Sequence, residues 1–491
     1  MTHLPRTDSA RSLPRQFCPM LSILFLACSL AGATPSSAAS SYALTYSLTD
    51  LGTLEGGRSY ALVLNDRGEV AGFAVPPSGY QRAFLYDGTA MRDLGTLGGS
   101  LSDAMAINAG GQVVGWAQTL SGETHAFLYD GATMRDLGTL GGSWSLAVAI
   151  NAGGQVVGYA FPASGGAHAF LYDGATMRDL GTLGGTGSVA YAINADGQVA
   201  GYSLTAVGGP HAFLYDGTAM RDLGTLGGSS STAVAINASG QVVGHALPPS
   251  GGARAFLYDG TAMRDLGTLG GNHSDALGIN AGGQVVGRAE TSDGETHGFL
   301  YDGTAMRDLN SLLEASGDGW TVIEARAIND AGQIAAIAST PDATFRAVLL
   351  TPRITVAIDI KPESPWESFL PKSHRRIPVA ILSAPGFHAP AQVDQDSLTF
   401  GRTGGEPSLA FCNRTPEDVN GDGLGDLVCH FHSQAAAIQE GDTQGMLRGR
   451  TVSGIAFTGS DTLRIVPARR WIHGFAHHRR LTEPAPRTLR P

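Results

Sequence analysis

The sequence predicts an all-β chain, in which a seven-bladed β-propeller is followed by a small antiparallel β-sandwich. The motif Asp-Leu-Gly-Thr-Leu recurs every 43 residues, and each interval holds four short apolar runs separated by turn residues. A fixed period of roughly 20–50 residues is typical of repeat architectures, and four strands per repeat is typical of a propeller blade. The motif begins at Asp50, Asp93, Asp136, Asp179, Asp222 and Asp265, and a degenerate copy begins at Asp308.

The repeat that starts at Asp93 illustrates the four expected strands. Three of them are predicted at 102–108, 112–117 and 125–129, where apolar and small residues alternate, and the fourth follows Ala132. The sequence Asn-Ala-Gly-Gly favours a turn after the first strand, because an Asn side chain can form a hydrogen bond with the nearby backbone and Gly adopts positive φ without strain. Asp130-Gly131 predicts a tight hairpin between the third and fourth strands.

The two ends of the repeat region complement one another. The seventh repeat stops after a third strand, 346–350, and a spare strand, Tyr42–Leu51, precedes the first complete repeat. We therefore expect the N-terminal strand to complete the last blade and close a ring over residues 40–351. The alternative is a parallel β-helix or open solenoid, which needs capping segments at its ends. Neither end of the repeat region resembles a cap.

Composition excludes one class of partner. The chain carries 32 Lys and Arg against 43 Asp and Glu, for a formal net charge of −11, and its only lysines are Lys361 and Lys372. Binding to nucleic acid needs a basic face. We therefore expect no nucleic-acid partner. Separately, we expect a monomeric protein.

Residues 1–39 resemble an export signal. Arg6, Arg11 and Arg15 precede an apolar run from Met20 to Leu30, and small residues suitable for cleavage follow, up to Ala39. Lipidation at Cys28 is a less favoured alternative, because the residues before it make a poor lipidation box. No second long apolar segment follows, so we expect no stable membrane span. The sequence thus predicts a secreted or cell-surface protein.

The composition changes after residue 351. Strands are predicted at 354–360, 378–382, 397–400, 426–431 and 463–466, which suggests a β-sandwich over residues 352–467. Cys412 and Cys429 are the cysteines that remain after the expected signal, and in an exported protein they are expected to form a disulfide. Residues 468–491 are basic and rich in histidine, and we expect a disordered tail there.

The module also contains a candidate calcium loop. Oxygen-bearing side chains alternate from Asp418, with a glycine at the sixth place and an acid at the ninth, as in calcium-binding loops. The twelfth place, which usually holds a bidentate Glu, is Cys429, so another acid must complete the shell. The alternative is an acidic turn without metal. The expected ligands are Asp418, Asn420, Asp422, Leu424 and Asp426.

The repeats resemble the bacterial extracellular repeats known as HAF repeats, named for His-Ala-Phe. The tripeptide stands at His125, His168 and His211, with variants in other repeats. The resemblance implies secretion and a surface or extracellular setting, and it brings no established chemistry. The C-terminal part is similar to a module of exported bacterial proteins that contains Ile-Pro-Val-Ala-Ile-Leu and Glu-Asp-Val-Asn-Gly-Asp-Gly. Because the histidines occur once per blade, we expect them to be structural.

A binding function is predicted where the repeats differ. Variation is concentrated after Leu-Gly-Gly and between the second and third strands, and in an up-and-down blade both places lie at the same end of the ring. Loops on a rigid scaffold often carry binding residues, and aromatic side chains there could contact a glycan or a protein. The alternative is relaxed variation at solvated positions. The candidates are Trp116, Trp144, Tyr159, Tyr202, His245, His273 and Arg288.

A catalytic function is less favoured by the sequence. A hydrolase or lyase needs unique acids or a base that converge on one point, whereas most polar residues here are repeated. Asp103 and Asp275 differ from their counterparts in most repeats, but they occur in two similar units. We find no Ser-His-Asp set, metal-hydrolase motif or phosphate loop. A secreted hydrolase or lyase acting on polysaccharide remains the alternative to a binding or adhesion scaffold.

Overall fold

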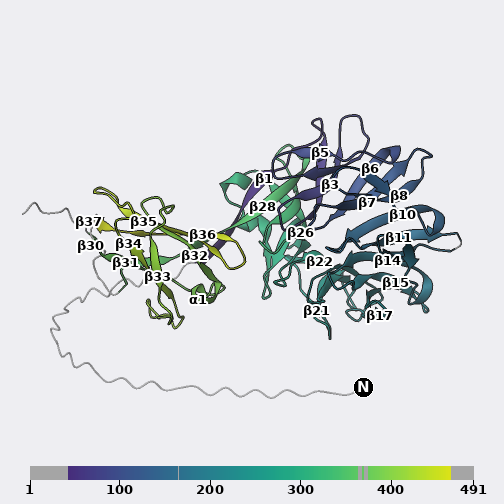
Figure 1. The fold of residues 1–491 in the computed structure, drawn as a ribbon. Coiled ribbons are helices and arrows are strands. Elements are labelled where there is room, and N and C mark those ends of the chain that lie inside the picture. The colour runs from purple at the N-terminus through teal and green to yellow at the C-terminus, as the bar shows by residue number, and fades with distance from the viewer. Residues whose placement is uncertain (1–41, 164, 363–367, 370–373, 466–491) are drawn as a thin grey trace, which may run out of the picture. The chain divides into compact units, whose positions relative to one another are not determined.

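The structure is a computed structural model, and it describes residues 42–163, 165–362, 368–369 and 374–465. The expected signal segment and basic tail lie outside these residues. The described chain is built from strands, as predicted, with one short helix, α1 (Ala389–Gln392), and two 3₁₀ turns, η1 (Leu309–Leu312) and η2 (Ala315–Gly317). Figure 1 shows the strands in chain order.

Each repeat forms an antiparallel four-stranded sheet. In the repeat that follows Asp93, the strands are β6 (Gly98–Ile107), β7 (Val113–Thr119), β8 (Thr124–Tyr129) and β9 (Met134–Asp136). The first strand begins four residues earlier than predicted, because the Gly-Gly pair joins the ladder and Gly98 pairs with Thr119. Glycine is required at this step, since a Cβ on Gly99 would lie 2.7 Å from the Gln118 side chain.

Five further sheets repeat this arrangement. The first consists of β2 (Arg58–Leu64), β3 (Val70–Val75), β4 (Arg82–Tyr86) and β5 (Met91–Asp93). The third has β10 (Gly141–Ile150), β11 (Val156–Pro162), β12 (His168–Tyr172) and β13 (Met177–Asp179). The fourth has β14 (Gly184–Ile193), β15 (Val199–Thr205), β16 (Pro210–Tyr215) and β17 (Met220–Asp222). The fifth and sixth comprise β18 (Ser231–Ile236), β19 (Val242–Ala246), β20 (Arg254–Tyr258), β21 (Met263–Asp265), β22 (Gly270–Ile279), β23 (Val285–Thr291), β24 (Thr296–Tyr301) and β25 (Met306–Asp308).

The last blade combines both ends of the repeat region. It contains β26 (Thr321–Ile328), β27 (Ile334–Ser339) and β28 (Phe345–Val356), and its fourth strand is β1 (Tyr42–Asp50). β1 runs antiparallel to β28, from Tyr42 opposite Val356 to Asp50 opposite Val348. In Figure 1 the purple β1 lies beside the green β28. The N-terminal strand thus occupies the place that the sequence predicts for it.

A ring of asparagines links all seven blades. At the end of each first strand, an Asn side chain donates a hydrogen bond from Nδ2 to the backbone carbonyl of its counterpart in the next blade, at 3.1–3.3 Å. Because the last of these bonds returns to the first blade, the ring is closed, which excludes the open-solenoid alternative. Its members are Asn65, Asn108, Asn151, Asn194, Asn237, Asn280 and Asn329.

Repeated contacts hold neighbouring blades together. Ser102 accepts a hydrogen bond from the backbone of Ala83 in the preceding blade and donates one to the carbonyl of Gly95. The arginine of one blade lies over the tyrosine of the next, as in Arg92 over the Tyr129 ring at 5.5 Å. Each of these interactions recurs at the 43-residue period, so these repeated residues form the contacts between blades.

The C-terminal module has two sheets around a shared apolar core that includes Phe400, Phe431 and Phe457. One sheet holds β29 (Ile358–Ile360), β31 (Arg376–Ile381), β34 (Leu427–His432) and β33 (Leu409–Cys412). The other holds β32 (Val393–Gly401), β35 (Gln444–Thr451) and β36 (Ala456–Thr462), and the end of β28 pairs with β36. β30 (Ser368–Phe369) pairs with β37 (Arg464–Ile465).

Candidate binding site at one end of the propeller

The two ends of the ring differ in how their polar groups are satisfied. At the turn end, which carries the Asn-x-x-Gly and Asp-Gly turns, the asparagine amides are fully engaged. Asn108 donates to Gln112 Oε1 and to the Asn151 carbonyl, and its Oδ1 accepts bonds from the backbone N–H groups of Gly110 and Gln112. The opposite end, the variable end, carries the loops that differ between repeats.

The candidate residues of the second strands occupy one register position. Trp116 faces Asp103 across the strand pair, as Tyr159 faces Leu146. Tyr202, His245 and Arg288 hold the same position in β15, β19 and β23. Trp144 and His273 lie on the first strands β10 and β22 rather than in loops, because those strands begin at the Gly-Gly pair. The sheet ladder fixes the second-strand candidates, whereas Trp144 and His273 lie where that ladder is interrupted, between Gly141 and Ser145 and between Gly270 and Ser274.

Two adjacent blades supply an aromatic wall, defined as Trp144, Tyr159, Phe161, Tyr191 and Tyr202. The Trp144 ring lies 5.2 Å from Tyr159 and 5.4 Å from Phe161, edge to face in both cases. Tyr191 lies 6.0 Å from Tyr202. Burial raises the pKa of Tyr159, and the charge of Tyr202 in the next blade adds to this effect.

The fifth and sixth blades supply a charged cluster around Asp275, which is only 4% exposed. Arg288 holds its Oδ2 at 2.8 Å through one Nη and at 2.9 Å through Nε. His273 Nε2 lies 3.1 Å from the same oxygen, and His245 Nδ1 lies 3.5 Å from Oδ1. Burial alone would raise the pKa of Asp275, but Arg288 and the two histidines outweigh it and lower the pKa. Asp275 thus gathers three of the predicted site residues.

The cluster continues into the seventh blade. Arg288 reaches Glu324 at 3.4 Å, and Arg326 forms a second ion pair with the same carboxylate. Glu324 is 8% exposed. It borders a cavity of about 270 Å³ whose walls are mainly apolar, so a charged pair lies beside a hydrophobic recess. The lining residues are Tyr60, Leu62, Phe73, Ile323, Glu324, Arg326, Ile337 and Phe345.

Asp103 is a buried acid in the second blade. Burial raises its pKa to about 7, and a hydrogen bond from Gln81 Nε2, 2.9 Å from Oδ2, together with smaller effects of Arg326 and Trp116, only partly offsets this. Its other oxygen, Oδ1, is buried and accepts no hydrogen bond within the described residues.

We name these groups together the channel mouth: the aromatic wall, the Asp275 cluster, Glu324, Arg326, Trp116 and Asp103. Sequence reasoning singled out its aromatic, histidine and Arg288 members but missed Asp103, Asp275, Glu324 and Arg326 as site residues. A signal was present, because the first-strand residue at the register position of the second-strand candidates also varies from blade to blade. These residues are Tyr60, Asp103, Leu146, Val189, Thr232, Asp275 and Glu324.

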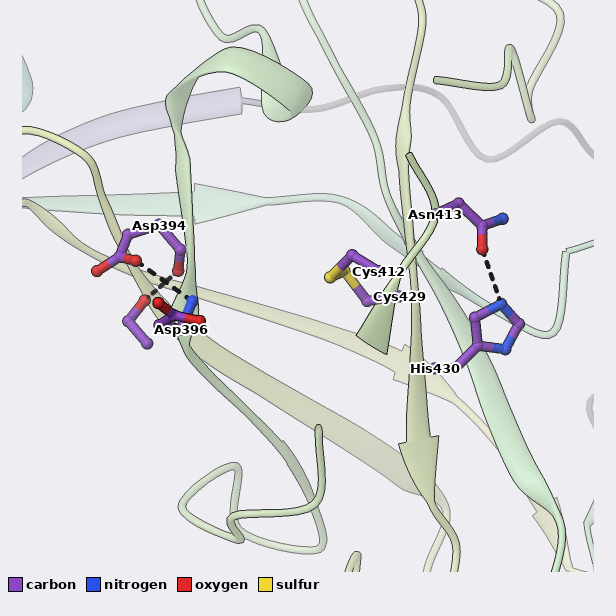
Figure 2. The surroundings of a disulfide bond; sticks show 7 residues. Asp394, Asp396, Cys412, Asn413, Cys429 and His430 are labelled. Atoms are coloured by element: carbon purple, nitrogen blue, oxygen red, sulfur yellow. Dashed lines mark hydrogen bonds between the residues drawn. A yellow bond between two sulfur atoms is a disulfide. The ribbon is translucent and has the colours of Figure 1, made fainter. Parts of the chain in front are cut away.

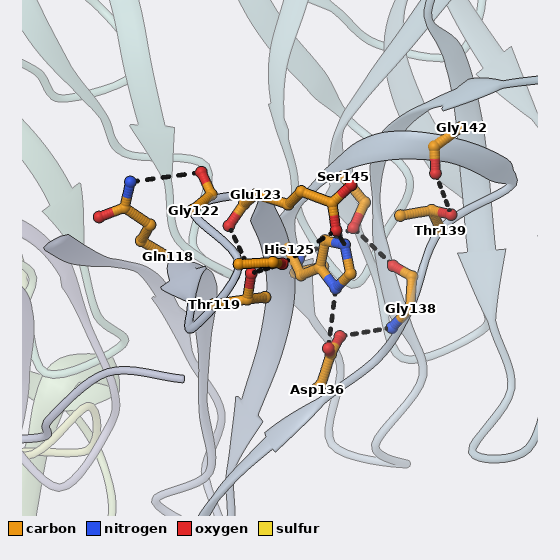
Figure 3. A network of polar contacts seen from close by, with 12 residues as sticks. Gln118, Thr119, Gly122, Glu123, His125, Asp136, Gly138, Thr139, Gly142 and Ser145 are labelled. Carbon is orange, nitrogen blue, oxygen red and sulfur yellow. Dashed lines mark hydrogen bonds and ion pairs between the residues drawn. The ribbon is translucent and has the colours of Figure 1, made fainter. Parts of the chain in front are cut away.

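The histidines of the His-Ala-Phe motif have a different environment. Figure 3 shows His125 Nδ1 pointing at Asp136, with 2.8 Å between Nδ1 and Oδ2. The same pair recurs in other blades, for example at 2.6 Å between His168 and Asp179. Each pair ties the third strand of a blade to its short fourth strand. This geometry agrees with the structural role expected for these histidines.

The predicted calcium loop connects β33 and β34. Asp418 accepts hydrogen bonds from the backbone N–H groups of Gly421, Asp422 and Gly423. Asp426 is buried, and its two oxygens accept bonds from the N–H groups of Ser383 and Val419 at 2.7 and 2.9 Å. No group of three His, Cys, Asp or Glu side chains in the described chain is placed to hold a metal. Calcium binding therefore stays a prediction.

The predicted disulfide is present. Cys412 and Cys429 face each other on β33 and β34 and are bonded. Figure 2 shows this bond beside His430, whose Nε2 lies 3.2 Å from Asn413 Oδ1. The bridge closes the loop that carries the candidate calcium ligands. A helix long and apolar enough to cross a membrane is not found among the described residues.

One family profile matches part of the chain. The profile of a family of proteins of unknown function, DUF3466, matches residues 229–347. None of the curated protein sequences matches the chain. The resemblances to HAF repeats and to the exported-protein module remain interpretations.

Solved structures with a similar arrangement include propellers. A puromycin-hydrolysing peptidase of Mycobacterium tuberculosis is 14% identical with a TM-score of 0.43, and the match covers 60% of this chain but only 51% of the peptidase. The Aleuria aurantia lectin, described as a six-bladed β-propeller, is 13% identical with a TM-score of 0.33, and the match covers 53% of this chain and 96% of the lectin. YCF48 bound to D1 peptide is 10% identical with a TM-score of 0.38, and the match covers 62% of this chain and 94% of YCF48. These likenesses concern the fold alone.

Proposed function

We propose that the protein is an exported binding scaffold that recognises its ligand at the channel mouth. The observation that carries this proposal is the asymmetry of the ring. Repeated residues hold the blades together, whereas aromatic and charged side chains that differ from blade to blade lie on the first and second strands of the blades. A rigid scaffold that presents a non-repeating set of side chains is suited to binding.

Export is supported by the signal-like segment 1–39 and by the bond between Cys412 and Cys429, since disulfides persist in oxidising compartments. A secreted or cell-surface location gives extracellular glycans and proteins as the available ligands. Fractionation of the native host tests the location. A protein that stays in the reducing cytoplasm contradicts it.

The binding proposal is tested with a panel of extracellular glycans and cell-surface proteins. The probe is the chain from residue 40 onward, as wild type and as the double variant Trp144→Ala, Tyr159→Ala. We expect at least one panel member to bind the wild type and to lose affinity for the double variant. A panel in which every binder is indifferent to both substitutions contradicts the proposal.

A second candidate, polysaccharide hydrolysis, is favoured by one observation. Acid catalysis at neutral pH uses a carboxyl group whose pKa is raised by burial. Burial raises the pKa of Asp103 to about 7. Release of reducing ends from panel polysaccharides, abolished in Asp103→Asn, supports this candidate. Binding of a polysaccharide without release of reducing ends supports the scaffold function instead.

We further propose that the loop 418–426 binds calcium. The first support is that oxygen-bearing side chains alternate along the loop. The second is that burial raises the pKa of Asp426, and that repulsion by Asp422 and Asp418 adds to this increase. A cation would reverse this repulsion. The loop carbonyl of Leu424 and the amide of Asn420 would supply further oxygens.

A further inference from the structure

The channel mouth holds polar atoms whose bonding is incomplete. Three buried side-chain atoms of the described chain lack a hydrogen bond: Asp103 Oδ1, His245 Nδ1 and Arg326 Nε. His245 and Arg326 still have carboxylates nearby, in Asp275 and Glu324. Asp103 Oδ1 has no ion-pair partner: Gln81 bonds the other oxygen, and the Trp116 side chain is the further hydrogen-bonding neighbour of this carboxyl group. A buried polar atom without a partner costs about 1–3 kcal/mol.

The location of these atoms is informative. At the turn end the same fold satisfies both the amide nitrogen and the oxygen of Asn108, with neighbours in its own blade and the next. The protein therefore has the means to pair its buried polar groups. Asp103 Oδ1, which is buried and has no ion-pair partner, therefore indicates a position that a ligand completes.

Aromatic surface lies beside these groups. Trp116 is the cross-strand partner of Asp103, and the next blade carries Trp144 and Tyr159 in edge-to-face contact. Phe161, at the rim of this wall, is 40% exposed. Flat, partly exposed aromatic rings next to hydrogen-bonding groups suit ligands with both apolar faces and hydroxyl edges.

The charges of the mouth nearly cancel. The guanidinium groups of Arg288 and Arg326 are paired with Asp275 and Glu324. An anionic ligand would approach these carboxylates, and a cationic ligand would approach the guanidiniums, so neither sign is favoured. A hydroxyl group both donates and accepts, and it can therefore complete Asp103 Oδ1 in either protonation state.

We infer that the channel mouth binds a neutral saccharide, with hydroxyl groups bonded to Asp103 and sugar rings stacked on Trp144 and Tyr159. This inference rests on the proposed function and narrows its ligand to one chemical class. The chain from residue 40 onward is titrated calorimetrically at pH 7 with neutral hexasaccharides (cellohexaose, maltohexaose, laminarihexaose and xylohexaose), with hexagalacturonate and with a hexalysine peptide.

The expected result is binding of at least one neutral hexasaccharide and of neither charged probe. Trp144→Ala and Asp103→Leu should each weaken it about 10-fold or more, since each removes a contact worth roughly 1.4 kcal/mol or more. Asp103→Asn keeps hydrogen-bonding capacity and should stay within about threefold of wild type. Asp130→Asn, at the turn end, should have no effect.

Four results overturn the inference. The first is binding of a charged probe alone. The second is an affinity for Asp103→Asn as low as for Asp103→Leu, which means that the site requires charge. The third is the absence of binding by every neutral hexasaccharide. The fourth is a neutral saccharide that binds but is indifferent to Trp144 and Asp103, in which case the inference and the proposed function both fail. If instead a charged probe alone binds and depends on Trp144, the proposed function stands and only the assignment of a neutral saccharide is wrong.

Discussion

Asn329 donates a hydrogen bond from Nδ2 to the backbone carbonyl of Asn65 at 3.1 Å, although 264 residues separate them in the chain. This bond is the last step of the asparagine ring, and β1 pairs with β28 in the same blade. Together they join the beginning of the repeat region to its end. The channel mouth is therefore assembled on a closed scaffold, in which residues of the second and seventh blades keep a fixed separation.

Deletion of β1, residues 42–50, should open the ring. It removes two buried side chains, Tyr46 and Leu48, and leaves the edge of β28 unpaired. Burial of each such side chain contributes about 1.5–3 kcal/mol, so the midpoint of thermal unfolding should fall clearly. Scanning calorimetry measures it, with Thr49→Ala at an exposed position of the same strand as the control. An unchanged midpoint in the deletion variant contradicts closure by this strand.

Asp103→Asn should stabilise the protein above pH 7 and leave its stability almost unchanged at pH 4. Burial raises the pKa of Asp103 to about 7 from 3.8, so between these values the unfolded state releases its proton first. The free energy of unfolding therefore falls as pH rises through this window and levels off above it. At about 1.4 kcal/mol per pH unit, the gain from the neutral amide is at most about 4 kcal/mol.

Urea unfolding of wild type and Asp103→Asn at pH 4, 6 and 8 measures this gain. Asp130→Asn is the matched control, because backbone N–H groups of Thr133 and Ala132 lower the pKa of that exposed carboxylate. Its substitution should give no gain at any pH. Equal stability of wild type and Asp103→Asn at pH 8 would mean that the Asp103 carboxyl is hydrated rather than buried.

The architecture could be predicted from the sequence because its determinants are local and repeated. The 43-residue period, the Asn and Asp-Gly turns, and the spare strand at Tyr42 indicate blades and their closure without long-range information. β35 was missed for a physical reason. Its buried face carries Gly445 and Gly449, where a Cβ would lie 2.9 Å from Phe400 and 2.7 Å from Phe457, so the usual apolar alternation is absent.

The composition of the channel mouth was less accessible to sequence reasoning. Asp103 and Arg326 are 223 positions apart, and nothing in either repeat indicates that the charge of Arg326 acts on the Asp103 carboxyl group. The role of Asp275 as the common partner of His245, His273 and Arg288 likewise depends on contacts between blades. Cross-strand register, applied to the varying first-strand position, would have identified these acids.

Calcium should stabilise the C-terminal module and leave the propeller unaffected. A cation that binds only the folded loop contributes about 2.7 kcal/mol at a concentration 100 times its dissociation constant. Scanning calorimetry of the full chain with millimolar Ca²⁺ and with chelator should resolve a shift of one transition. Asp422→Ala should abolish that shift. If Ca²⁺ produces neither heat nor shift, the loop is an acidic turn.

Reduction of the disulfide should destabilise the same module. The bond joins residues 17 positions apart, and a loop of this size is stabilised by about 3 kcal/mol. Reductant should lower the module's unfolding midpoint without changing that of the propeller. The Cys412→Ser, Cys429→Ser variant should reproduce the reduced midpoint and no longer respond to reductant. Independence of both midpoints from reductant contradicts a structural role of the bond.

The most direct test of the central claim is the location of ligand contact on the ring. Hydrogen–deuterium exchange is followed for the chain from residue 40 onward, with and without a panel ligand that binds it. We predict slower exchange in segments 98–104, 116–124 and 141–147 at the variable end, and unchanged exchange in the turn-end segment 108–112. Protection of the turn end, with the variable end unchanged, would contradict binding at the channel mouth.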